Sequence, residues 1–507
     1  MKKTGYAIII IIPLLSACAD LDITPDSSID KNQFYQSEAD ALTAVNGIYA
    51  ELTPPSGFYG MYNNQTVYLG DLASEYVKAG ANTNSAHIRE IGNFTISSNN
   101  DFMRCAWSEA YTGINRANIV IDRLSEPSSS ISSEIQNRLV NEAKFLRALF
   151  YFNIVRWWGA VPLILHDGEG EGQERTPVDE VYSQIVKDLE DATALSQEYH
   201  SEGRATGGAA LATLSKVYLT WAQTDSPEGK AKQTDFYRKS LEYADRVIDS
   251  GNYRLVQNVW DLFATDKKNG VEHIFSVQHA QLSNVSGHCV FAMGWSDSEP
   301  VLIVNDVKYY NQIDDADQRK NGAFAKSLWN PNTNSRFTYK VPLFRKYIDT
   351  LNYDKDQFAG RNMNFAYIRY AEVLLIKAEV ENELNGPTAV AYDAINQVRR
   401  RAYNQPVSSA SPYDLSGLTK DEFREKLQAE RFTEFILEGT HWFDLVRWRK
   451  LIQTVRPQKP NVTAKHYLFP LPQQQLNLNP NLTQNWGYES EDGTNPYASY
   501  EPGYSEN

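Results

Sequence analysis

The chain has 507 residues, of which 42% are hydrophobic and 22% are charged. Acidic residues outnumber basic ones by 63 to 49, which gives a formal net charge of −14. This composition excludes global disorder, because so many apolar residues can bury a large core. It also excludes nucleic acid as an expected partner, since nucleic-acid binding requires a basic surface. Three cysteines, Cys18, Cys105 and Cys289, are too few and too widely spaced for a disulfide framework.

The amino terminus predicts an exported, lipid-anchored protein. Lys2 and Lys3 precede an apolar run over 7–15, which is too short to span a bilayer. Leu-Ser-Ala-Cys at 15–18 resembles the bacterial lipobox, in which cleavage before the cysteine leaves it carrying acyl chains such as palmitate. We therefore expect a signal peptide over 1–17, lipidation of Cys18 and a polar tether over 18–30. Several acyl chains would hold the folded body, residues 31–507, at the membrane.

The next segment predicts one helix and then a loop region. Ser37 is a suitable N-cap for a segment with apolar residues at helical spacing, and Pro54 and Pro55 end it. Residues 56–100 are rich in Asn, Gly, Ser and Tyr and lack a helical period. We expect loops with short extended pieces there.

Helix pairs dominate two later regions, about 101–250 and 366–450. Apolar residues recur at helical spacing over 107–124, 135–158, 178–195, 209–222, 236–248, 369–384 and 388–402. Asn385-Gly386-Pro387 combines a helix stop with a helix start. The predicted fold class is mostly α, with tetratricopeptide-like helix pairs packed against one another.

An irregular, loop-rich subdomain is predicted over 251–345, between the two helical regions. The alternating segment 271–277 reads as a strand, and a run rich in Gly, Ser and Asn follows at 281–298. This subdomain and residues 56–100 are the expected ligand-facing regions.

Several motifs resemble the RagB/SusD family of outer-membrane nutrient-binding lipoproteins. They are Glu-Ala-Lys-Phe-Leu-Arg-Ala-Leu-Phe-Tyr-Phe at 142–152, Trp-Gly-Ala-Val-Pro-Leu at 158–163, Arg-Tyr-Ala-Glu-Val-Leu-Leu-Ile-Lys-Ala-Glu at 369–379, Trp-Phe-Asp-Leu-Val-Arg-Trp at 442–448 and Phe-Pro-Leu-Pro at 469–472. The resemblance covers nearly the whole chain. It implies a SusD-like fold at the cell surface, capture of a glycan, and delivery to a SusC-like TonB-dependent outer-membrane transporter. It implies no catalysis and no cofactor.

Sugar recognition requires flat aromatic faces and planar polar groups. Trp295 is the foremost candidate, because it lies in a segment without helical or strand period. The other candidate contacts in the two irregular regions are Asp71, Tyr76, Arg89, Asn93, Phe94 and Trp329. By contrast, the resemblance implies helices around Trp157, Trp158, Trp442 and Trp448, which are therefore expected in the core.

Two alternative functions remain open from the sequence. One is a secreted all-α glycoside hydrolase, with Glu434 and Glu438 as its carboxylate pair. The neighbouring Arg431 opposes it, because a cation lowers the pKa that a general acid needs raised. We instead expect ion pairs within and between helices to account for the alternating charges at Glu430, Arg431, Glu434, Glu438, Asp444 and Arg447. The other alternative is a helical-repeat docking scaffold without a small ligand. The eight histidines are dispersed, and no metal site is predicted.

Overall fold

A computed structural model describes residues 35–53, 60–81, 83–196, 203–279, 300–330, 333–347, 363–489 and 495–501. Most of these residues are helical, and the strands are few and short. The strands of the described residues form three separate antiparallel pairs. The prediction of a mostly α fold is confirmed.

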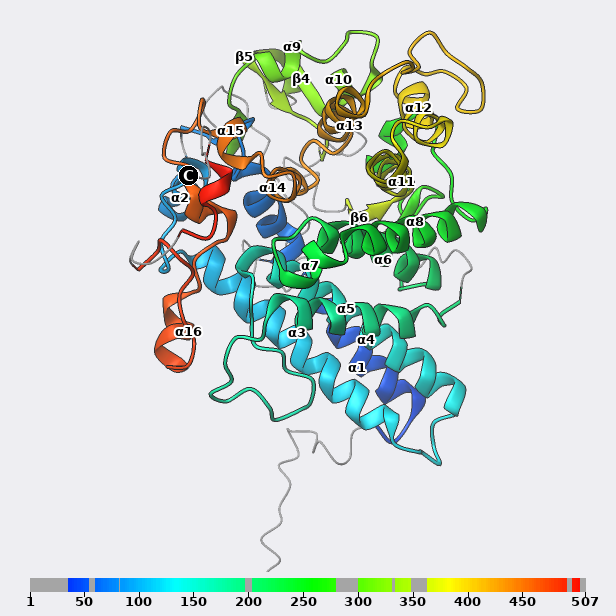
Figure 1. Cartoon of the computed structure of the whole chain (residues 1–507), viewed down its shortest axis with the longest axis vertical. Helices are drawn as coiled ribbons and strands as arrows, with labels where there is room; N and C mark the ends of the chain where they lie inside the picture. Colours follow the sequence, from blue (N-terminus) through cyan, green and yellow to red (C-terminus); the bar gives the residue numbers. More distant parts are fainter. Residues whose placement is uncertain are drawn as a thin grey trace, which may run out of the picture.

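The first helical region is a continuous stack (Figure 1). Its helices are α1 (Glu38–Ala50), α3 (Asp101–Ser125), α4 (Ser133–Trp158), α5 (Val178–Ala192), α6 (Gly207–Ala222), α7 (Pro227–Ala231) and α8 (Gln233–Asp249). Helix α3 packs on α4, α4 on α5, α5 on α6, and α6 on α8. Every helix predicted between residues 101 and 250 is present, and the short α7 is an addition.

Local signals explain two features of this stack. Ser37 caps α1 in a reciprocal arrangement: its hydroxyl accepts from the Asp40 amide at 3.2 Å, and the Asp40 carboxylate accepts from the Ser37 amide at 3.0 Å. Small residues let α6 and α8 approach closely. There, Ser215 and Ser240 each donate a hydroxyl hydrogen bond to the other's carbonyl oxygen, at 2.9 and 2.7 Å.

The second helical region continues the first, because α11 packs on α8. Its elements are α11 (Tyr370–Asn385), α12 (Ala389–Ala402), α13 (Lys420–Glu434), α14 (His441–Arg447), α15 (Leu451–Val455), η4 (Ala464–Tyr467), α16 (Gln473–Leu478) and η5 (Ala498–Tyr500). Gly386 ends α11 with a φ of +82°, a conformation that favours glycine, and Thr388 caps α12. The predicted stop and start are therefore confirmed.

Residues 60–100 differ from the expected loops. They form two wide helical turns, η1 (Met61–Gln65) and η2 (Tyr68–Leu72), then β1 (Val77–Ala79) and α2 (Ala86–Asn93). The prediction missed α2 because eight residues are too few to establish a period. Its signals are local: Ser85 caps it, and Ile88 and Ile91 are buried on one face.

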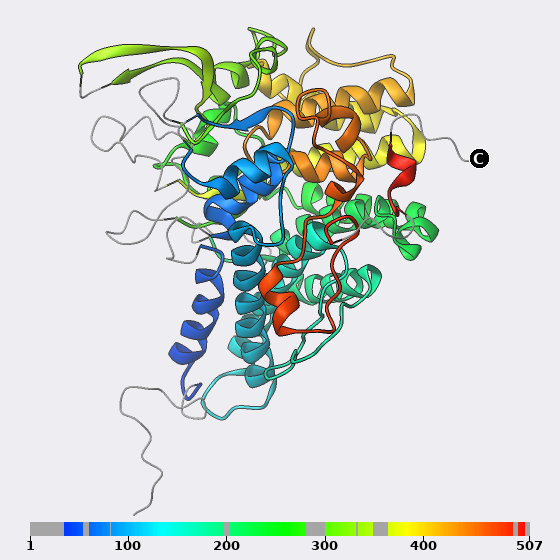
Figure 2. The same ribbon diagram turned by 90° about the vertical axis from the view of Figure 1, so that its left-hand side faces the viewer.

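The inserted region contains most of the strands. Its elements are η3 (Val259–Phe263), β2 (His273–Val277), β3 (Leu302–Val304), α9 (Lys308–Asn311), α10 (Gln318–Ala323), β4 (Phe324–Asn330), β5 (Ser335–Phe344) and β6 (Phe365–Arg369). The predicted strand is confirmed as β2, which pairs with β6. Strand β1 pairs with β3, with Val77 opposite Val304, so residues 60–81 lie beside the insertion. The β4–β5 hairpin projects from the helical body (Figure 2).

Candidate functional site

Two sequence predictions fall outside the described residues. Trp295 lies in the gap between residues 279 and 300, and Cys18 precedes residue 35. The binding role of Trp295 and the lipidation of Cys18 therefore stay predictions.

Three other candidate ligand contacts are wrong, because their side chains lie in the core. Asp71 and Tyr76 are 0% exposed and Phe94 is 2% exposed. An Asp71 carboxylate oxygen accepts from the Gly439 amide at 2.6 Å, and the Tyr76 hydroxyl accepts from the Leu437 amide at 3.0 Å. These side chains bind the segment between α13 and α14 rather than a ligand.

The surroundings of Asp71 change its ionisation. Burial raises the pKa of Asp71 to about 7, although the Gly439 amide and the nearby His441 and Lys346 lower it in part.

Phe94 packs edge-on against His466, with ring centroids 5.2 Å apart. Both Asp71 and Phe94 are structural contacts to the carboxy-terminal part of the chain.

Arg89 and Asn93 are exposed, and both lie on α2, four residues apart and therefore on one face. One nitrogen of the Arg89 guanidinium donates to the Thr83 carbonyl. The β1–β3 pair joins this part of the chain to the insertion. The two regions predicted to face a ligand are thus neighbours in the fold.

Trp329 is the remaining candidate, and it is accessible. It lies on β4 with 42% of its surface exposed, one residue pair from the end of the β4–β5 register. The hairpin is held by its own small core of Ala325, Leu328, Tyr339 and Leu343. Arg336 lies directly opposite Trp329 and is also exposed. The Arg336 guanidinium donates to the Ser327 hydroxyl at 3.0 Å, so an exposed indole and an exposed guanidinium lie on adjacent strands of this hairpin.

A second surface feature is a groove of about 480 Å³ in the helical region. Helices α4, α5, α6, α7 and α14 and the segment 495–501 form its walls. Its aromatic lining residues are Tyr182, Phe443, Tyr467, Tyr497 and Tyr500. Polar groups at its edge include Asp225, which pairs with Lys230 at 3.2 Å and Arg449 at 2.8 Å. We refer to this feature as the tyrosine groove.

The sequence did not predict the tyrosine groove. Its tyrosines come from α5, η4 and residues 495–501, which are more than 280 residues apart at their extremes. The ring of Tyr182 stacks on Trp221, and Tyr467 stacks on Tyr497. One face of each of these rings is therefore covered by protein. The density of tyrosines over 488–504 was the one sequence signal available.

The motif residues of α13 and α14 form a buried ion-pair network, as predicted. Glu434 pairs with Arg319 at 2.8 Å and with Arg401 and Arg369, each at 2.5 Å. Glu438 pairs with Lys346 at 2.7 Å and Arg369 at 2.8 Å. Further along, Arg431 pairs with Asp444 at 2.9 Å.

These pairs argue against the hydrolase hypothesis. Burial by itself would raise the pKa of Glu434, but Arg401, Arg369 and Arg319 outweigh it and hold that pKa well below its ordinary value. Arg369 and Lys346 likewise lower the pKa of Glu438 against the effect of burial. Neither side chain is solvent-accessible. Neither carboxylate has the raised pKa or the access to substrate that a general acid needs.

Groups that could hold a metal ion and helices that could span a membrane also bear on the type of site. Among the residues that the structure describes, no three His, Cys, Asp or Glu side chains are placed to hold a metal ion. None of the described helices is both long and apolar enough to cross a membrane.

Comparison with known proteins shows the family. A model of the SusD family matches residues 301–465, and a model described as starch-binding associating with outer membrane matches residues 21–219. The SusD-like protein P2 of Formosa agariphila is 30% identical over 96% of this chain and 99% of its own length. This chain belongs to the SusD family.

Solved structures share the fold. A SusD homologue from Bacteroides thetaiotaomicron has a TM-score of 0.76 at 24% identity, over 90% of this chain and 98% of that one. Surface glycan-binding protein A from the same species, solved in complex with laminarihexaose, has a TM-score of 0.72 at 20% identity. That comparison covers 89% of this chain and 99% of the other. The SusD-like fold expected from the sequence motifs is therefore confirmed.

Proposed function

We propose that this protein is a cell-surface glycan-binding lipoprotein. It captures an oligosaccharide or polysaccharide and delivers it to a partner SusC-like TonB-dependent transporter in the outer membrane. Membership of the SusD family supports this function, as does the family model described as starch-binding. The laminarihexaose complex of a protein with the same fold supports a glycan as the ligand class.

The observation that carries the proposal is the exposed indole of Trp329 on the projecting hairpin. An indole face covers the apolar C–H side of a sugar ring, and the planar guanidinium of Arg336 can donate to sugar hydroxyls. Trp295, Arg89 and Asn93 are the further proposed contacts of this ligand face. The proposed role of the protein is binding and not catalysis.

The anchor and the division of the chain belong to the same proposal. Residues 1–17 are removed, Cys18 carries the acyl chains, and residues 18–30 tether the body to the outer membrane. Helical repeats at about 101–250 and 366–450 dock on the transporter, and the regions at about 56–100 and 251–345 face the ligand. Lipid is the only contact with the membrane, because a protein surface with this negative charge is repelled by anionic lipid.

Native affinity electrophoresis of residues 19–507 through gels that contain different polysaccharides tests the function. We expect retardation by one polymer, and no release of reducing sugar in a parallel assay. Sugar release would show an enzyme instead. Absence of both signals across a broad panel, together with co-purification with a TonB-dependent barrel, would favour the docking scaffold.

Three variants and one control locate the binding surface. Trp295→Ala and Trp329→Ala should relieve the retardation. Leu478→Ala is a matched control, because Leu478 is an apolar side chain on α16 with 70% of its surface exposed. Relief by Tyr500→Ala alone would move the site to the tyrosine groove.

A further inference from the structure

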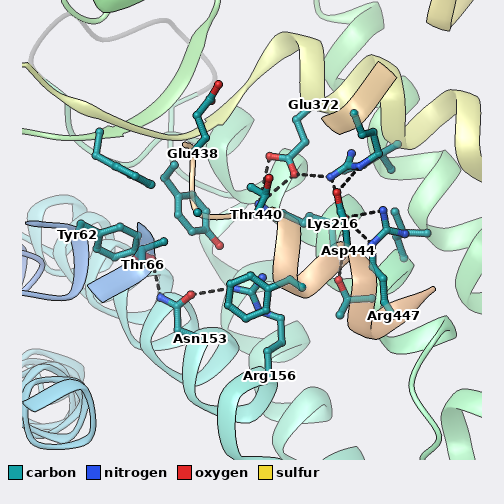
Figure 3. Close-up of a pocket in the computed structure, with 18 residues that line it drawn as sticks. Tyr62, Thr66, Asn153, Arg156, Lys216, Glu372, Glu438, Thr440, Asp444 and Arg447 are labelled. Atoms are coloured by element: carbon teal, nitrogen blue, oxygen red, sulfur yellow. Dashed lines mark hydrogen bonds and ion pairs between the residues drawn. The ribbon is translucent and has the colours of Figure 1, made fainter. Parts of the chain in front are cut away.

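A small interior cavity of about 40 Å³ lies where the two helical regions meet. Side chains from α4, α6, β6, α11, α13 and α14 line it, and Figure 3 shows how its charged groups converge. Arg156, Thr220, Phe443 and Arg447 line both this cavity and the tyrosine groove. The cavity and the groove therefore adjoin each other at these four side chains.

Three hydrogen-bond donors that line the cavity have no partner among the described residues. They are the Nη1 nitrogen of Arg431 and the hydroxyl of Tyr367, which are both buried, and the Nη1 nitrogen of Arg156, whose side chain is only half-buried. The Arg431 and Tyr367 side chains are more than nine-tenths buried. Buried donors without acceptors are rare in folded proteins, so the Arg431 and Tyr367 groups indicate an acceptor inside the cavity.

Arg156 has no carboxylate partner within 4 Å in the described part of the chain. Its other nitrogens donate to the Phe152 carbonyl at 2.8 Å and to the side-chain oxygen of Asn153 at 2.7 Å. The guanidinium lies between two rings, 3.8 Å from the centroid of Phe152 and 4.0 Å from that of Phe443. These contacts orient the charge but do not neutralise it.

The other cations that line the cavity each form an ion pair with a carboxylate. Lys216 and Arg431 share Glu372, while Arg431 and Arg447 share Asp444. Arg447 also pairs with Glu379. The Glu438 carboxylate, although it lines the cavity, bonds to Lys346 and Arg369. Four cations therefore face three carboxylates, and the excess positive charge is that of Arg156.

The unpaired charge of Arg156 is partly removed from solvent, because its side chain is half-buried. Burial lowers the pKa of Arg156 and also that of Lys216. An arginine stays charged at neutral pH, so the cost falls on folding unless a negative group compensates it.

We propose that this cavity binds one small inorganic anion, such as chloride. Its volume suits two or three water molecules or one halide ion, and excludes a sugar acid. The anion accepts from Arg156, Arg431 and the Tyr367 hydroxyl. It thereby links α4 of the first helical region to β6 and α13 of the second.

Thermal unfolding of the full chain in sodium chloride and in sodium gluconate at equal ionic strength tests the site. Gluconate is too large for the cavity. Binding to the folded state should raise Tm by on the order of 1 °C for each tenfold increase in chloride above its Kd. Arg156→Met should abolish the difference between the two salts. Arg238→Met should keep it, because Arg238 is an exposed residue that pairs with Asp235 on α8. Equal Tm values for wild type in both salts would overturn the proposal.

Crystals grown in sodium bromide give a second readout that does not depend on folding of a variant. The proposal predicts an anomalous peak in the cavity, within hydrogen-bond distance of Arg156. Water alone at that position would contradict it. Neither readout involves a glycan, so the anion site can fail while the proposed function stands.

Discussion

The helices around Glu434 and the β4–β5 hairpin differ in where they place the side chains that suggest a function: the helices bury theirs, and the hairpin exposes its own. The carboxylates of Glu434 and Glu438 resemble a catalytic pair in the sequence, yet each is buried and held by two or more cations. The hairpin carries no recognisable motif, yet it exposes the indole of Trp329 on a separate small core. The motif residues of this chain therefore stabilise the fold, and the accessible chemistry lies where the sequence is irregular.

This separation predicts that substitutions in the helices change stability and substitutions on the hairpin change binding. Glu434→Ala should have the largest effect. It would leave Arg319, Arg369 and Arg401 buried without their shared partner, at a cost of about 3–5 kcal/mol in unfolding free energy. Chemical denaturation of the variant and the wild type measures the difference.

The matched control for Glu434→Ala is Glu425→Ala. Glu425 lies on the same helix, α13, but is exposed. We expect a change within about 0.5 kcal/mol there. Equal effects of the two substitutions would show that the buried network does not stabilise the helices.

Asp71→Asn should stabilise the protein in a pH-dependent way. The pKa of Asp71 is about 7 in the folded protein against an ordinary value of 3.8. Between these values the unfolded chain releases a proton that the folded chain retains, so the wild type loses stability as pH rises through this range. The asparagine cannot titrate. The unfolding free energy of Asp71→Asn should therefore exceed that of wild type by an amount that grows from pH 4 to pH 8, to at most about 4 kcal/mol.

Tm measured across that pH range for Asp71→Asn, wild type and Asp266→Asn checks this expectation. Asp266 is an exposed aspartate, so its substitution should leave the pH profile unchanged. A constant offset between Asp71→Asn and wild type at all pH values would contradict the raised pKa.

Gly113→Ala should destabilise the stack by a smaller amount. A methyl group at Gly113 on α3 would lie 2.3 Å from the Phe150 ring on α4, which must shift to admit it. Such overpacking costs about 1–3 kcal/mol. Gly47→Ala on α1 is the control, because the nearest atom there is the end of the flexible Arg116 side chain at 3.9 Å. Denaturation midpoints should therefore fall for Gly113→Ala and stay unchanged or rise for Gly47→Ala.

Much of the helical architecture could be predicted from the sequence, because its signals are local. The Ser37 cap, the small residues of α6 and the stop at Gly386 each act within one or two turns. Trp157, Trp158 and Trp442 are buried, as their places on helices that resemble those of the family led us to expect, whereas Trp448, expected there too, is only half-buried.

The candidate site was less predictable, because it depends on contacts between distant segments. Asp71 and Tyr76 resemble loop residues in the sequence. In the fold, their side chains are buried and accept hydrogen bonds from backbone amides more than 360 residues away. The excess charge of Arg156 is equally invisible, since it emerges only when three carboxylates from other helices are assigned to other cations. Composition alone could not distinguish these buried polar groups from exposed ones.

The most direct test of the central claim is isothermal titration of Trp329→Ala with the polysaccharide identified by affinity electrophoresis, with Tm measured on the same sample. We expect a loss of about 1–3 kcal/mol in binding free energy, by analogy with other aromatic stacking platforms, and a Tm within about 1 °C of wild type. Unchanged affinity in Trp329→Ala would contradict the assignment of the hairpin to the ligand face.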